Sequence, residues 1–129
     1  MFYKGNIFSI ILVISGLSLN AQDYSIQSEI IEVDADLDQI IYKKNVLFIS
    51  DNVTFNADEL VVIESTEKFT ATGEPVKIRF FDGYEFIEGE AKKVEIIDDN
   101  LMLSDSVSFV RSGNTIRSES LIIKLKKND

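Results

Sequence analysis

The sequence predicts an all-β fold, and three features support that prediction. From Ile30 onward, apolar and polar residues alternate over short runs, which is the pattern of a strand with one buried face. These runs are rich in Val, Ile, Phe and Tyr, residues that suit a pleated sheet. Turn-forming residues separate the runs at regular intervals, and no later window has the spacing of an amphipathic helix. Together these features predict an antiparallel meander, arranged as a sandwich, jelly roll or barrel.

The N-terminal residues 1–21 have the features of a secretory signal peptide. Lys4 lies in a short N-terminal region, a predominantly apolar run follows over 7–19, and Ala21 precedes a polar stretch. The apolar run is short for a membrane span, which needs about 20 residues. We therefore expect cleavage after Ala21, which leaves 22–129 as a single exported domain. Retention of the segment as an N-terminal anchor is the alternative.

The first predicted strand pair encloses a turn that resembles part of a calcium loop. Asp34, Asp36 and Asp38 have the opening spacing of such a loop. The pattern then fails, because Gln39 stands where the loop needs Gly and Asn45 where it needs a bidentate Glu. Since Asp favours turns, we predict a turn between two strands and no metal site.

Further turn signals divide the rest of the chain. They lie at 50–52, 65–68, 72–75, 82–83, 98–100 and 112–114. Asp82-Gly83 is the strongest hairpin signal, because it separates two alternating runs. The single proline, Pro75, lies in a predicted turn, as expected for a residue that cannot donate to a sheet ladder.

An internal repeat links distant parts of the chain. The segment that contains Ala57 recurs 61 positions later around Ser118, and a shorter copy occurs 34 positions later around Ala91. Each copy has an apolar run, a small residue, one or two polar residues and another apolar run. Repeats of one supersecondary unit bury each other's faces when they stack, so the repeat indicates an architectural unit.

The composition excludes several functions. The formal charge is −9, and it becomes −10 if Lys4 leaves with the signal peptide. Such an acidic chain is unsuited to nucleic acid, because phosphate binding relies on clustered Lys and Arg. The absence of His and Cys excludes imidazole and thiol catalysis, and it means that burial alone must stabilise an exported domain. We therefore expect neither an enzyme nor a cofactor.

Four segments, in this order, closely resemble the OstA-like domain family, the group of LptA, LptC and the LptD N-terminal domain. They are KNVLFISDNVTFNADELVVI, TATGEPVKIRF, YEFIEGEAKKVEI and LMLSDSVSFVRSGNTIRSESLIIKL. The resemblance extends from Glu29 to Leu125. It implies a twisted, open β-jellyroll of repeated short antiparallel strands. It also implies location in the periplasm, where the domain shields the acyl chains of lipid A in an apolar groove.

The resemblance also indicates partners and site residues. The implied partners are lipopolysaccharide, LptC-like and LptD-like jellyroll proteins, and further copies of the chain in a head-to-tail oligomer. The groove would be formed by the inward-facing residues Phe48, Phe55, Val62, Ile78, Phe80, Phe86, Val94, Ile96, Leu103, Phe109, Ile116 and Ile123. The edge-strand interfaces would contain Ile30, Ile31, Val33, Leu121, Ile123 and Leu125.

The sequence alone leaves several alternative functions open. The chain could be an LptC-type paralogue, or the groove residues could fill a closed core, as apolar strand faces usually do. A structural or adhesive β-solenoid of the envelope would bind no lipid, but it should keep one constant period, whereas the copies lie 34 and then 27 positions apart. A carboxylate-dependent hydrolase would need an acid pair, and none stands out.

Overall fold

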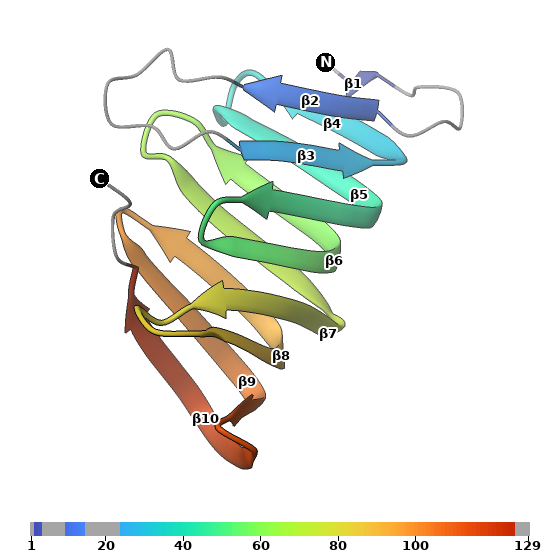
Figure 1. The fold of residues 1–129 in the computed structure, drawn as a ribbon. Coiled ribbons are helices and arrows are strands. Elements are labelled where there is room, and N and C mark those ends of the chain that lie inside the picture. The colour runs from blue at the N-terminus through green and yellow to red at the C-terminus, as the bar shows by residue number, and fades with distance from the viewer. Residues whose placement is uncertain (1, 4–9, 15–23, 126–129) are drawn as a thin grey trace.

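The computed structural model describes residues 2–3, 10–14 and 24–125, and the described residues form an all-β, antiparallel open sheet (Figure 1). The predicted fold class is therefore confirmed. The predicted signal peptide, 1–21, lies mostly outside the described residues. In the described part of the chain, no helix is long and apolar enough to cross a membrane. The strands are β1 (Phe2–Tyr3), β2 (Ile10–Ile14), β3 (Tyr24–Ser28), β4 (Ile30–Asp34), β5 (Gln39–Ser50), β6 (Val53–Ile63), β7 (Lys68–Phe81), β8 (Phe86–Ile97), β9 (Asn100–Arg111) and β10 (Asn114–Lys124).

The long strands follow one another in the sheet in sequence order, from β4 and β5 to β10. Each of these pairs is antiparallel, and each pair from β5–β6 to β9–β10 is interrupted near its middle by a shift in register. On β5 the shift lies between Lys43 and Val46, and the two residues between them have positive φ. An extra residue in one strand bends it and strengthens its twist. Because neighbouring strands bend at corresponding positions, the whole sheet folds over on itself.

The bends divide the sheet into two layers. The front layer contains β3 and the halves of β5 to β10 at 46–50, 53–57, 76–81, 86–91, 107–111 and 114–118. The back layer contains β4 and the other halves, at 39–43, 59–63, 68–72, 93–97, 100–104 and 120–124. In Figure 1, β5 to β8 turn over along the right side of the molecule. We call the opposite side, where the hairpin turns of both layers lie, the mouth.

The internal repeat now has a structural explanation. Ala57 lies at the bend of β6 and pairs with Val46, and Ser118 has the same place opposite Val107 on β10. Ala91 lies at the bend of β8. The repeated unit is thus one long strand that bends at a small residue, where the sequence suggested two short strands. A small side chain fits there because the two layers meet at the bend, and Ala91 is fully buried.

Most predicted turns join strands where expected, including the Asp-rich turn at 35–38 and the hairpin at Asp82. Asp82 N donates to the carbonyl of Glu85 at 3.1 Å, and Gly83 has a φ of 104°. The predicted turn at 72–75 is wrong. These residues lie inside β7 and form its bend, because Gly and Pro also mark the bulges that interrupt a ladder.

Candidate functional site

The inner faces of the two layers meet in one continuous apolar core. Nine of the twelve predicted groove residues belong to it, each with an exposed fraction of 9% or less. They come from both layers and from strands β5 to β9. The nine residues are Phe48, Phe55, Val62, Ile78, Phe80, Val94, Ile96, Leu103 and Phe109.

Phe86 was predicted to face inward, and that placement is wrong. It pairs with Phe81, and its ring lies 5.2 Å from that of Phe81 and 4.1 Å beneath the Arg79 guanidinium. All three side chains belong to the outer face of the front layer, and Phe86 is 45% exposed. The neighbouring Ile87 takes the inward place, because a shift of one residue along a strand moves a side chain to the other face.

Two predicted groove residues lie on β10, the last strand of the sheet. Ile116 pairs with Phe109 and is 40% exposed, while Ile123 is partly buried against the core. Both face inward, but no described strand pairs with the other side of β10. The apolar interior is therefore less covered at this end of the molecule.

The predicted edge residues divide between two regions. Ile30, Ile31 and Val33 lie on β4, which pairs with β5 on one side and with the short β1 on the other. Leu121 and Ile123 lie on β10. Leu125 follows β10, is 7% exposed, and donates its N–H to the carbonyl of Asp99 at 2.6 Å. Its side chain belongs to the core, so Leu125 is not available at an edge.

An aromatic group joins the layers at the N-terminal end, and it combines the predicted groove residue Phe48 with two residues that the sequence analysis did not single out, Tyr24 and Phe69. We call Tyr24, Phe48 and Phe69 the mouth cluster. Phe69 of the back layer meets Tyr24 edge-on at 5.2 Å and Phe48 at 5.5 Å, both from the front layer. Phe48 also stacks on Phe55 at 4.8 Å. The alternating pattern could have indicated Phe69, because it lies two positions before the inward Ala71.

Two tyrosines add polar atoms to this end of the interior. Burial raises the pKa of Tyr42, and the nearby Tyr24 and Glu64 raise it further. Burial also raises the pKa of Tyr24, together with the negative charges of Glu64 and Glu67. Both phenols are therefore neutral at physiological pH. They can donate or accept hydrogen bonds inside a largely apolar space.

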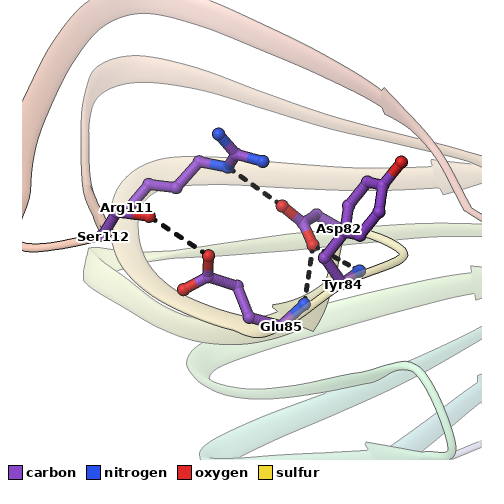
Figure 2. A network of polar contacts seen from close by, with 5 residues as sticks. All are labelled: Asp82, Tyr84, Glu85, Arg111 and Ser112. Carbon is purple, nitrogen blue, oxygen red and sulfur yellow. Dashed lines mark hydrogen bonds and ion pairs between the residues drawn. The ribbon is translucent and has the colours of Figure 1, made fainter.

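Both rims of the mouth carry acidic residues, and the turns of the back layer carry more of them. Front-layer turns are tied together by a polar network, in which Arg111 Nε donates to Asp82 at 3.0 Å and Ser112 Oγ donates to Glu85 at 3.3 Å (Figure 2). In the back layer, Asp38 accepts a 2.9 Å hydrogen bond from Ser65 N, which links two turns. The acidic residues of the back-layer turns are Asp36, Asp38, Glu64, Glu67, Asp98 and Asp99.

The Asp-rich turn forms its own hydrogen bonds. Asp34 Oδ1 accepts from the N–H groups of Asp36 and Leu37 at 3.1 and 3.2 Å. Hydrogen bonds from Ser65 lower the pKa of Asp38. Within the described residues, no group of three or more acidic side chains is arranged to hold a metal ion. The hydrogen bonds of Asp34 and Asp38 are those expected of turn residues.

The bent antiparallel sheet and its apolar interior define a β-jellyroll protein. The family model for the LptA/(LptD N-terminal domain) LPS transport protein matches residues 25–129. The chain therefore belongs to this lipopolysaccharide transport family, which confirms the resemblance noted in the sequence. The family is one of transport proteins, in keeping with the expectation that the chain is not an enzyme.

A solved structure supports the same fold. LptH from Pseudomonas aeruginosa, described as the LptA-homologous periplasmic component of the conserved lipopolysaccharide transport device, aligns with a TM-score of 0.70. The alignment covers 80% of this chain and 76% of that chain, at 15% sequence identity. No curated protein matches the chain.

Proposed function

We propose that this chain is a periplasmic lipopolysaccharide carrier of the LptA type. It shields the acyl chains of lipid A between its two layers and bridges the inner and outer membranes through edge-to-edge assembly. The observation that carries the proposal is the continuous apolar interior, which runs from Ile26 on β3 to Phe109 on β9 within a single bent sheet. Carrying a lipid needs such a surface and needs no catalytic group.

The charge of the chain indicates which part of the lipid it holds. With a formal charge of −9 and acidic turns along the back rim, the protein offers little attraction to lipid phosphates. Burial of acyl chains is favourable by about 25 cal/mol per Å² of apolar surface. The sugars and phosphates therefore stay outside the mouth, while the acyl chains lie inside.

The ends of the sheet support assembly with other jellyrolls. β3 already accepts the apolar strand β2 in antiparallel register, from Ile10 opposite Ser28 to Ile14 opposite Tyr24. Removal of the predicted signal peptide would uncover this edge and the β4 edge that pairs with β1. Exposed edges take up another chain's strand through main-chain hydrogen bonds. We propose LptC-like and LptD-like proteins, and further copies of the chain, as the partners.

Depletion of the protein in its own cells tests the proposal. Newly made lipopolysaccharide should then accumulate at the inner membrane and fail to reach the cell surface. If the chain were a structural envelope protein with a closed core, or a hydrolase, lipopolysaccharide would still reach the cell surface after depletion. That result would contradict the proposal. Complementation with the wild-type chain, at matched expression, controls for effects of depletion on neighbouring genes.

A further inference from the structure

The interior of this structure is filled by its own side chains. Phe80 and Leu103 are fully buried, and the other inward residues of the middle strands are nearly so. An acyl chain cannot contact such residues while both layers keep their positions. If the chain carries lipid as proposed above, the layers must separate, and the structure indicates where.

The two long sides of the jellyroll are held together differently. At the bends, each strand from β5 to β10 continues from one layer into the other, so the polypeptide itself joins the layers. At the mouth, each hairpin turn connects two strands of the same layer. Closure there depends on side-chain contacts, which can break and form without rearranging the sheet. The bends are therefore the hinge side, and the mouth is the side that opens.

The mouth cluster lies across this opening. Tyr24 begins β3 and pairs with Ser50, the last residue of β5, so it lies at the front rim. Phe69 follows the 64–67 turn of the back rim. In the described part of the chain, both ring contacts that join the two layers involve Phe69. Well-placed aromatic pairs add only a modest stabilisation beyond their burial, so the acyl chain of a lipid can replace these contacts.

At the opposite end of the described sheet, no ring contact joins the two layers. Ile116 on β10 is 40% exposed although it faces inward, and Leu121 and Ile123 are only partly buried. The apolar interior is therefore more exposed at β10 than along the middle strands.

We propose that the mouth cluster is a gate for the lipid. Phe69 separates from Tyr24 and Phe48 when an acyl chain enters, and the layers turn about the bends. This inference rests on the proposed carrier function, but it assigns a role to residues that the carrier function alone does not single out.

A covalent bridge across the mouth tests the gate. The wild-type chain contains no Cys, so the double substitution Tyr24→Cys with Phe69→Cys introduces the only thiols. A short bifunctional thiol reagent then joins the rims. The matched control is Thr54→Cys with Arg79→Cys, a pair of directly opposed outward residues within the front layer. Binding of purified lipopolysaccharide to the full-length chains is measured before and after bridging, with thermal unfolding as the check on folding.

We expect bridging of Tyr24→Cys/Phe69→Cys to weaken lipopolysaccharide binding at least tenfold. Each bridged variant is compared with its own unbridged form, and bridging of the control pair should change binding less than twofold. Equal binding by the bridged and unbridged mouth variants would overturn the gate and leave the carrier function intact. Failure of the wild-type chain to bind lipopolysaccharide would overturn both.

Discussion

Phe80 and Phe86 lie close together along the front layer but have opposite surroundings. Phe80 is fully buried in the core, whereas Phe86 packs on the outer face between Phe81 and the Arg79 guanidinium. At the scale of single residues, the direction of the side chain therefore decides both its contribution to stability and its access to the proposed cargo. The same chemical substitution at the two positions separates these effects.

We expect Phe80→Ala to lower the free energy of unfolding by about 3–5 kcal/mol, because it removes a buried ring and leaves a cavity. Phe86→Ala should cost about 1 kcal/mol, since it loses one cation–π contact and one ring contact at a partly exposed site. Chemical denaturation of both variants measures the difference. Equal losses would contradict the assignment of the two rings to opposite faces.

Asp82 provides a pH-dependent prediction. Hydrogen bonds from the N–H groups of Glu85 and Tyr84, together with Arg111, lower its pKa below the ordinary value of 3.8. The unfolded chain therefore takes up this proton more readily than the folded chain as the pH falls. The stabilisation is fully present above pH 3.8 and is lost as the pH falls through the lower, folded-state pKa.

Asp82→Asn should accordingly have a lower free energy of unfolding than wild type at pH 7. The difference in this free energy between the two proteins should shrink as the pH falls. The measurement is urea denaturation of both proteins at a series of pH values from 7 to about 3, the region where carboxylates titrate. A difference that stays constant over this range would show that the Asp82 carboxylate is not preferentially stabilised by the fold.

At the scale of strands, Gly89 is fixed by its neighbours across the sheet. It faces inward between Ile78 and Phe109. A Cβ added at Gly89 would lie 2.7 Å from both the Phe109 Cβ and the backbone oxygen of Ser108. The absence of a side chain at Gly89 therefore allows β8 and β9 to approach each other closely at Phe109.

Gly89→Ala should destabilise the protein by about 1–3 kcal/mol, the usual cost of overpacking, because backbone atoms would have to move. Glu90→Ala, on the adjacent outward position of β8, is the matched control and should change stability by less than about 0.5 kcal/mol. Thermal unfolding compares the two variants. A neutral Gly89→Ala would mean that β8 and β9 are less closely paired than described.

The β10 edge gives a prediction about assembly. Ile116 faces inward and is exposed at the end of the sheet, whereas the adjacent Thr115 faces outward. A charge that points inward at an edge opposes the addition of another strand. Ile116→Lys should weaken self-association at least tenfold by sedimentation velocity, and Thr115→Lys should have little effect. Unchanged association of Ile116→Lys would argue against β10 as an assembly edge.

Sequence patterns predicted the strands well but not every side-chain direction. Alternation within "VKIRFF" correctly placed Ile78 and Phe80 inward, because both lie on the same side of the β7 bend. The inward assignment of Phe86 failed because a turn of four residues, 82–85, precedes β8 and sets which residues face inward. Alternation could have indicated that Phe69 faces inward. Its contacts with Tyr24 and Phe48 could not be predicted, because they depend on how the two layers pack against each other.

At the scale of the whole molecule, bent strands account for both the repeat and the interior. Ala57 and Ala91 allow the layers to approach at the bends, and the residues on either side form opposing apolar walls. The family and the fold establish a jellyroll of lipopolysaccharide transport. Beyond the family and the fold, we propose that lipid acyl chains enter between the walls.

Photo-crosslinking in living cells tests this claim most directly. A photoreactive residue is placed at Phe48, Phe80 or Phe109, which face inward, or at the neighbouring outward positions Leu47, Arg79 or Val110. After irradiation, lipopolysaccharide adducts are detected by immunoblotting. The proposed function predicts adducts from the inward positions and none above background from the outward ones. The absence of adducts at all three inward positions, or equal adducts on both faces, would contradict it.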